Sequence, residues 1–169
     1  MNIPKNILSI GAAAFYNFAT ANLNEFSVDS ENSNLTAVDE VLFTKDMKRL
    51  LAYPPQKTDI SYSVPEGVER IDRQSFGRSV YLKSVHLPNT LIGTNNLTGS
   101  IPFNALSFYA SMSIEEFSVN ADNPRFTVVD GVLFNKDMTK LIAFPISKNI
   151  GGEYTIPSSV TYVDTCAFN

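Results

Sequence analysis

The sequence offers few residues of the kinds that carry out catalysis or hold metal ions. It contains one histidine, His86, and one cysteine, Cys166, among 169 residues. His86 stands between Val85 and Leu87, so alternation along a strand turns its side chain toward solvent, and the sequence names no acid or nucleophile beside it. For Cys166 we expect a buried and unreactive thiol, because a reactive one needs an electropositive, accessible environment. A single cysteine forms no internal disulfide.

Two runs rich in Asp and Asn could suggest calcium binding. They are VDSENSN at residues 28–34 and VNADNPR at residues 119–125. Their spacing lacks the alternating acids and central glycine of a calcium loop, so we interpret both as turns that leave a strand. The sequence also contains no phosphate-binding loop, nucleophile elbow or metal-binding helix motif. We therefore expect a protein that is not an enzyme and that uses no cofactor or metal ion.

Composition limits the class of protein and of partner. Hydrophobic residues make up 44% of the chain and charged residues 18%, which is typical of a globular protein. The net charge of -4 argues against a nucleic-acid partner, since phosphate backbones bind clustered Lys and Arg. No apolar run reaches the roughly 18 residues that indicate a membrane span. The first 21 residues could pass for a secretory signal, but Pro4, Asn6 and Asn17 fit one poorly, and the repeat pattern explains them better.

The sequence contains a long internal duplication. The stretch DEVLFTKDMKRLLAYP at residues 39–54 returns as DGVLFNKDMTKLIAFP at residues 130–145. Residues 25–57 align with residues 116–148 without a gap, and about 18 of the 33 positions are identical. Self-similarity at a fixed spacing indicates a repeated structural unit, because an active site is seldom duplicated so closely.

A shorter pattern recurs between these copies. It consists of an aliphatic residue and Pro, two aliphatics at three-residue spacing, and then a small residue and Phe. It begins at Ile3, Val64 and Ile156, with a degraded version at Leu87. Residues 94–113 do not follow it, and we interpret them as an irregular turn or longer loop. Proline ends the ladder of a strand, so each occurrence predicts a strand followed by a tight or briefly helical return.

Short strand signals lie before these returns. Their form is L-x-x-F-x-V or a close variant, beginning at Leu23, Leu82 and Ile114. Alternation of apolar and polar residues is typical of a half-buried strand, and a unit of this size buries its apolar face only by stacking on its neighbours.

The duplicated stretch predicts a β-hairpin. In the second copy, residues 132–134 and 141–144 are apolar runs, and residues 135–139 form a polar loop between them. In the first copy, the corresponding runs are residues 41–43 and 50–53. Gly131 suits a bend or bulge before the hairpin. Because Glu40 holds the same position in the first copy, we do not expect a positive φ to be required there.

These motifs resemble those of the BspA-like leucine-rich repeats, and the duplicated stretch resembles a hairpin insert that recurs in that family. The resemblance implies a repeat solenoid, an array of short β-strands with tight or short helical returns and inserted β-hairpins. Family members are mostly bacterial cell-surface or secreted proteins, and some are similar to adhesins. We expect one array over residues 1–169. Because the sequence stops in mid-repeat, we expect a fragment of a longer array, whose open end tends to associate end to end.

The expected function is non-catalytic recognition of a protein or glycan ligand at a bacterial surface, and the alternative is a structural spacer or display scaffold. No nucleic acid or membrane span is expected. Solenoids bind through continuous strand faces. The outward positions on that face are Asn24, Glu25, Ser27, Ser63, Lys83, Ser84, His86, Glu115, Glu116, Ser118 and Thr155. The hairpin tips add Lys45, Asp46, Lys136 and Asp137 as a second candidate contact site.

Overall fold

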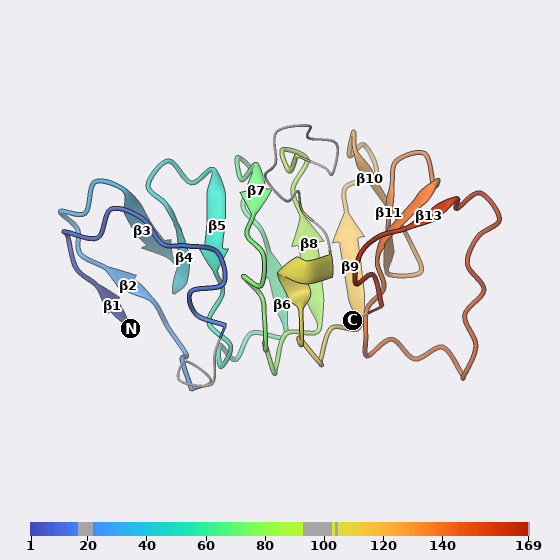
Figure 1. Ribbon diagram of the computed structural model, residues 1–169, viewed down its shortest axis with the longest axis horizontal. Coiled ribbons are helices and arrows are strands. Elements are labelled where there is room, and N and C mark those ends of the chain that lie inside the picture. Colours follow the sequence, from blue (N-terminus) through green and yellow to red (C-terminus); the bar gives the residue numbers. More distant parts are fainter. Residues whose placement is uncertain (17–21, 93–102, 104, 169) are drawn as a thin grey trace.

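The units of the chain lie side by side in a row. The computed structural model describes residues 1–16, 22–92, 103 and 105–168. Figure 1 shows that the chain advances along the long axis from β1 at one end to β13 at the other. The fold is rich in strands, and its one described helix is the short 3-10 helix η2 (Ala105–Phe108). None of the described helical segments has the length and apolar character needed to cross a bilayer.

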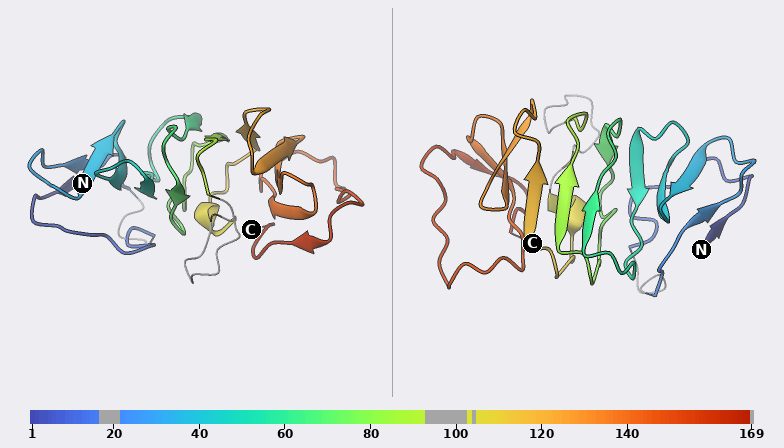
Figure 2. Two further views of the ribbon diagram at one scale, coloured as in Figure 1. Left: turned by 90° about the horizontal axis from the view of Figure 1, so that it is seen from above. Right: turned by 180° about the vertical axis from the view of Figure 1, so that it is seen from behind.

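Parallel strands form the common wall of the units. Strand β1 (Asn2–Ile3) pairs with β2 (Ser27–Val28). Strands β6 (Ser61–Ser63), β8 (Ser84–Leu87) and β9 (Glu116–Val119) form a three-stranded parallel sheet, and the right panel of Figure 2 shows these three strands together. The predicted strands after Leu23, Leu82 and Ile114 are therefore confirmed.

Each duplicated stretch forms an inserted antiparallel sheet. In the first copy, β3 (Leu35–Val38), β4 (Val41–Thr44) and β5 (Arg49–Ala52) are antiparallel, and β7 (Arg70–Ile71) adds parallel to β5. The second copy repeats this order with β10 (Phe126–Val129), β11 (Val132–Asn135), β12 (Lys140–Ala143) and β13 (Tyr162–Val163). The predicted hairpins are present as β4–β5 and β11–β12. The preceding strands, β3 and β10, were not predicted.

The turn before each hairpin corrects one expectation. Asp39 and Glu40 have φ angles of 47° and 67°, and Asp130 and Gly131 have angles of 48° and 73°. Positive φ at both central residues defines the two-residue turn whose twist matches paired strands. Positive φ therefore occurs at this position in both copies, and the expectation drawn from Glu40 was wrong. The strand that precedes the turn imposes this geometry, and that strand was missing from the sequence-based prediction.

The inserted sheets are buried on both faces, which explains their unbroken apolar runs. Leu42 of β4 packs in a core with residues of the first return, including Ile7 and Ile10. Its neighbours Val41 and Phe43 face the opposite way into the central core. All three residues of the run are 0% exposed. A run without alternation is what a strand needs when both of its faces meet apolar neighbours.

A buried asparagine joins each insert to the unit before it. The Asn32 Nδ2 donates to the carbonyl oxygens of Pro4 and Ile7, both at 3.0 Å. Its Oδ1 accepts from the backbone N–H groups of Asn34 and Leu35 at 2.8 Å. The Asp/Asn-rich run therefore forms a turn, as predicted.

The second copy repeats this linkage. The Asn123 Nδ2 donates to the Pro88 carbonyl oxygen at 3.3 Å, and its Oδ1 accepts from the N–H groups of Arg125 and Phe126. Asn32 and Asn123 are 1% and 0% exposed, so these bonds replace hydration that both side chains have lost.

The returns begin with a proline-anchored turn, and four of them share it. The backbone N–H three residues after each proline donates to the proline carbonyl oxygen, at Ile7, Val68, Leu91 and Val160. In the segment of residues 94–113, residues 94–102 and 104 lie outside the described part of the chain. Within the described part, Phe108 stacks on Phe76 with ring centroids 5.1 Å apart, and the Phe76 N–H donates to the Ser107 carbonyl. Ser107 and Phe108 thus occupy the place of the small residue and Phe of the repeat.

Candidate functional site

Strand pairing arranges side chains on the outer face of the β6–β8–β9 sheet in two rows, and all of them except Ser61 were predicted from the sequence. Pairing places Ser63 beside His86 and His86 beside Ser118, while the other row contains Ser61, Ser84 and Glu116. Successive side chains of a strand point to opposite faces, so residues such as Val85 and Phe117 turn into the core. We call these six residues, Ser61, Ser63, Ser84, His86, Glu116 and Ser118, the sheet face.

Polar contacts link the side chains on and beside the sheet face. The His86 Nδ1 lies 3.0 Å from the Ser118 Oγ. The Lys83 ammonium lies 2.8 Å from a carboxylate oxygen of Glu115, and both side chains are about half exposed. His86 is half-buried rather than fully exposed. These hydroxyl, imidazole and carboxylate groups can form hydrogen bonds with a partner. The side chain that His86 contacts is the Ser118 hydroxyl, and Glu116 lies in the other row.

The other predicted face residues lie elsewhere. Asn24 and Glu25 are exposed before β2, and Ser27 lies on β2, where its Oγ donates to the Asn2 Oδ1 at 3.2 Å. That two-stranded sheet is separate from β6–β8–β9. Thr155 is exposed and lies in no strand. The structure thus gathers Ser63, Lys83, Ser84, His86, Glu115, Glu116 and Ser118 but not Asn24, Glu25, Ser27 or Thr155.

The hairpin-tip residues are exposed, as their sequence suggested. Asp46 is held by local bonds, since its Oδ1 accepts from the Thr44 hydroxyl at 2.7 Å and the Lys48 N–H at 3.1 Å. The hydrogen bond from Thr44 lowers the pKa of Asp46 below its usual value. At the second tip, the Lys136 ammonium donates to the Ala121 carbonyl oxygen, and Asp137 is exposed.

A polar hollow adjoins the sheet face and was missed by sequence reasoning. It has a volume of about 540 Å³. It is lined by Glu115, Glu116, Asp130, Gly131, Lys148, Asn149, Ile150, Glu153 and Tyr154. The turn at Gly131 packs closely on β9, because its carbonyl accepts the Phe117 N–H at 2.9 Å. Four carboxylates and one ammonium give the hollow a negative charge, which suits cationic or hydroxyl-rich groups of a partner.

The corresponding turn of the first copy carries Glu40 in place of Gly131, and its charged side chains are paired differently. There, the Lys57 ammonium lies 2.6 Å from a Glu40 carboxylate oxygen and 3.1 Å from one of Asp59. Burial alone would lower the pKa of Lys57, but hydrogen bonds to these two acids raise it overall. In the second copy Gly131 replaces Glu40, and among the described residues Lys148 has no ion-pair partner. The exchange of Glu40 for Gly131 is the sequence signal that could have revealed the hollow.

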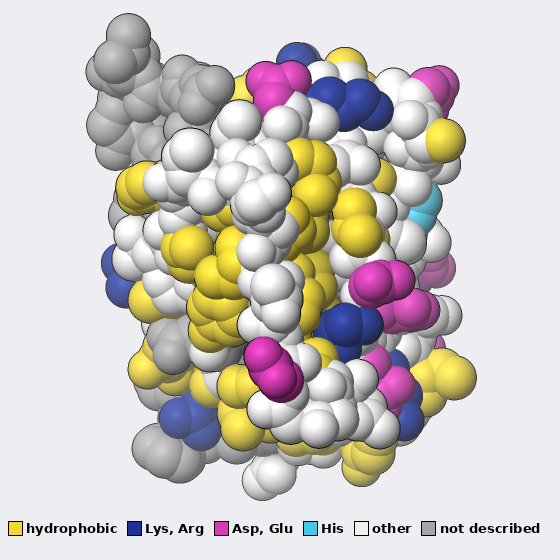
Figure 3. Space-filling view, turned by 90° about the vertical axis from the view of Figure 1, so that its right-hand side faces the viewer, with side chains coloured by type: hydrophobic (Ala, Val, Ile, Leu, Met, Phe, Trp, Pro, Cys, Tyr) yellow, Lys and Arg dark blue, Asp and Glu magenta, His cyan; other side chains and the backbone are white. Residues whose placement is uncertain are grey.

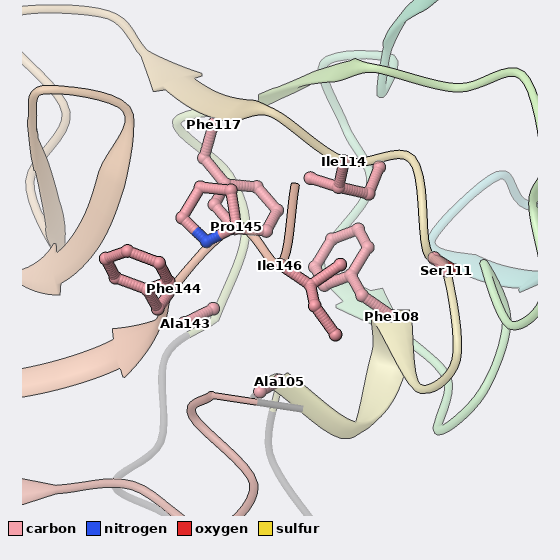
Figure 4. Close-up of a pocket in the computed structure, with 9 residues that line it drawn as sticks. All are labelled: Ala105, Phe108, Ser111, Ile114, Phe117, Ala143, Phe144, Pro145 and Ile146. Atoms are coloured by element: carbon pink, nitrogen blue, oxygen red, sulfur yellow. The ribbon is translucent and has the colours of Figure 1, made fainter. Parts of the chain in front are cut away.

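An apolar notch on the inner side is too small for a ligand. Figure 4 shows it between η2 and the segment from Ala143 to Ile146, with the rings of Phe108 and Phe117 along its wall. Its volume of about 10 Å³ has room for one water at most. No metal-binding group of three or more His, Cys, Asp or Glu occurs in the described ranges. Cys166 packs against the central core but is half-buried, so the expected full burial is wrong.

The strands, proline-anchored returns and stacked units define a leucine-rich repeat protein. The chain matches the family model described as "BspA type Leucine rich repeat region", in six copies, over residues 1–60 and 56–169. The chain therefore belongs to this family, as its motifs indicated. Repeat proteins of this kind are typically non-catalytic, which agrees with the expectation that the chain is not an enzyme.

Three solved structures are similar to the chain. The pneumococcal vaccine antigen PcpA is 31% identical, with a TM-score of 0.57 over 71% of this chain and 27% of its own. A leucine-rich repeat protein from Eubacterium ventriosum is 21% identical, with a TM-score of 0.54 over 72% of this chain and 36% of its own. A leucine rich cell surface protein from Faecalibacterium prausnitzii is 24% identical, with a TM-score of 0.51 over 69% of this chain and 34% of its own. The last two show the fold alone. No curated protein sequence matches the chain.

Proposed function

We propose that this chain is a recognition module of a bacterial cell-surface or secreted protein, and that it binds a protein or glycan through the sheet face and the adjoining hollow. Family membership and the vaccine-antigen description of one solved neighbour support the location. The row of units supports a repeat solenoid. If residues 1–169 form a single array, we expect calorimetry to show one unfolding transition.

One observation carries this proposal. Parallel pairing holds Ser63, His86 and Ser118 in register on a sheet whose opposite side is packed into the core. Side chains fixed in this way lose little conformational freedom when a partner binds, which favours recognition. The hollow beside Glu116 gives the flat face a concave border that can select a partner by shape and charge.

Binding to arrays of carbohydrates and matrix proteins tests the proposal. The double variant Glu115→Lys/Glu116→Lys reverses two charges where the sheet face meets the hollow, and we expect it to lose any ligand that the native chain binds. The double variant Glu31→Lys/Glu66→Lys makes the same charge change at exposed residues outside both candidate sites and should retain that ligand. Equal binding by both double variants would contradict the proposed site.

A spacer or display scaffold is the second candidate, and one observation favours it. Polar groups on and beside the sheet face already have partners within the chain, since His86 contacts Ser118 and Lys83 pairs with Glu115. A chain that bound nothing across the arrays while remaining folded would support the spacer.

A further inference from the structure

A second pocket lies between the first return and the first inserted sheet. Its volume is about 370 Å³, within the range of pockets that hold small molecules. It is lined by residues 8–10 of the return and by residues 33–35, residues 44–46, Arg49 and Leu51 of the insert. We call it the insert pocket. It shares no residue with the sheet face or the hollow, but it includes the first hairpin tip.

The walls of the insert pocket are held together by internal contacts. The buried Asn32 amide bridges them, because its Nδ2 donates to return carbonyls while its Oδ1 accepts from the N–H groups of Asn34 and Leu35. Ile10, Leu35 and Leu51 pack into one core beneath the pocket. Every lining residue belongs to the return or to the insert that follows it, so the pocket does not depend on what lies before the return. A pocket formed in advance costs little ordering when a ligand enters.

Cationic groups of the insert pocket remain available to a ligand. The Arg49 guanidinium donates to Asp72 through its Nε and one terminal nitrogen, which leaves the other terminal nitrogen without a contact in the described chain. The Arg49 side chain is 42% exposed, so a ligand can reach it. Lys45 is exposed, and its ammonium forms no hydrogen bond or ion pair with any described residue.

Acceptors lie beside these donors. The Asp46 Oδ1 is occupied by the Thr44 hydroxyl and the Lys48 N–H, which leaves its Oδ2 for a ligand. The Asn34 Nδ2 donates to the Ser33 Oγ at 3.0 Å, and the amide oxygen of Asn34 faces no donor among the described residues. The insert pocket therefore offers donors and acceptors together.

The charges of the insert pocket nearly cancel. Asp72 compensates Arg49, and Asp46 follows Lys45 directly in the chain. Such pairing of opposite charges is also found elsewhere on the surface, since Figure 3 shows Lys and Arg side chains next to Asp and Glu side chains on the face that it draws. A charged ligand would meet a like charge in the pocket as well as an opposite one. Balanced charges therefore favour a neutral ligand.

We propose that the insert pocket binds a neutral sugar residue of a glycan, as a site separate from the sheet face and the hollow. A sugar hydroxyl both donates and accepts, so it can accept from Lys45 or Arg49 and donate to Asp46. The apolar side chains of Ile10 and Leu51 suit the C–H groups of a pyranose ring. This assignment goes beyond the proposed function, because it does not require the sheet face to bind any ligand.

The second insert differs at the corresponding positions, which provides matched controls. Pro124 and Arg125 replace Ser33 and Asn34. The Arg125 guanidinium donates to the Asn89 carbonyl oxygen, and the Lys136 ammonium donates to the Ala121 carbonyl oxygen, both at 3.3 Å. Cationic groups that are available in the first insert are therefore engaged in the second.

NMR titration of the whole chain with simple sugars tests the proposal. The neutral probes are the methyl glycosides of glucose, galactose, mannose and N-acetylglucosamine, and the charged probes are glucuronic acid and glucosamine. At least one neutral probe should shift the amide signals of residues 8–10, 33–35 and 44–51, with a dissociation constant on the order of 1 mM. The charged probes should bind more weakly. No shift at these residues with any neutral probe up to about 50 mM, or shifts with the charged probes alone, would overturn the proposal.

Two pairs of variants test the location of the site. Ser33→Trp places a ring at the pocket from an exposed position and should weaken binding of the sugar at least tenfold, whereas Pro124→Trp at the matched exposed position should bind like the native chain. Lys45→Ala should weaken binding several-fold, and Lys136→Ala should leave it unchanged. Equal binding by the two members of both pairs would exclude the insert pocket.

Further controls separate this site from the sheet face. Circular dichroism checks the fold of each variant, and if Ser33→Trp unfolds, the comparison of Lys45→Ala with Lys136→Ala decides the outcome. Glu115→Lys/Glu116→Lys should bind the sugar like the native chain. Loss of sugar binding in that double variant would assign the sugar to the hollow instead, so the two sites can fail independently.

Discussion

The two inserted blocks have nearly the same internal geometry and very different surroundings. In the first, Tyr53 stacks on Phe76 with ring centroids 5.3 Å apart, and in the second Phe144 stacks on Phe168 at 5.0 Å. Yet Phe76 is 0% exposed and Phe168 is 49% exposed. The block therefore determines the arrangement of its own rings, while the neighbouring unit determines how much free energy that arrangement contributes.

The largest expected difference concerns these phenylalanines. Phe76→Ala removes a fully buried ring and should cost about 4 kcal/mol of unfolding free energy, through lost burial and a cavity. Phe168→Ala removes a half-exposed ring and should cost about 1 kcal/mol or less. Urea unfolding of both variants in dilute solution measures the two values. Equal losses would show that the second block is covered in solution as fully as the first.

The buried asparagines should behave alike in both copies. Asn123→Ala leaves the N–H groups of Arg125 and Phe126 without their acceptor, and we expect a loss of about 3 kcal/mol. Asn32→Ala should lose at least as much, because its amide donates to two carbonyls instead of one. Urea midpoints compare both with Asn120→Ala, an exposed control that should change little. A small effect at Asn123 alone would indicate that water substitutes for its amide.

Exchanging the residues Glu40 and Gly131 tests the difference between the two turns. Gly131→Glu places a Cβ 2.8 Å from the Cβ of Glu116 and forces a side chain into positive φ, so it should cost about 1–2 kcal/mol. The reverse change, Glu40→Gly, relieves the positive φ but removes the ion pair with Lys57, so its net effect should be close to zero. Thermal unfolding measures both. The pKa of Lys57 should fall in Glu40→Gly, which proton NMR can follow, and an unchanged value would contradict its assigned cause.

The smallest expected effect is a pH dependence confined to the first hairpin. The folded pKa of Asp46 is lowered, so the stabilisation it provides is complete above its ordinary value of 3.8 and is lost as the pH falls through the lowered value. In the second hairpin, the neutral Asn135 accepts the N–H groups of Thr139 and Lys140 instead. The protection factor of the Lys48 amide, which corrects for the intrinsic pH dependence of exchange, should therefore fall in acid, while that of the Thr139 amide should not. Asp46→Asn serves as the control that removes the difference.

The sequence predicted the elements that depend on local pattern. The alternation of apolar and polar residues around Val85 and Phe117 predicted their strands correctly. Two apolar runs on either side of a polar loop predicted each hairpin. The first strand of each insert was missed although Phe126–Val129 consists of one aromatic and three β-branched residues and precedes Asp130-Gly131, a strong hairpin signal. The Asp/Asn-rich run at residues 119–125 was interpreted as a turn. The strand begins directly after that turn, at Phe126, so the two elements were not separated.

The candidate site was less accessible from sequence because its parts are distant along the chain. Alternation identified His86 and Ser118 as outward residues, but only strand pairing shows that they are neighbours. The hollow forms where Glu116, Gly131 and Lys148 come together in space. These residues are distant along the chain, so no local sequence pattern predicts their proximity. Thr155 was assigned to the same face by analogy with Ser63, yet a strand forms at Ser63 because β8 pairs with it.

The bonds of Asn123 have a consequence for how such chains lengthen. Its amide donates to a main-chain oxygen of the preceding unit, at Pro88, and every residue type carries such an oxygen. A duplicated block can therefore be inserted after any unit that makes the same proline-anchored turn, whatever side chains that unit displays. Recombination between gene segments needs no matched pair of mutations at the junction, so the exposed faces of neighbouring blocks are free to diverge, as those around Glu40 and Gly131 have done.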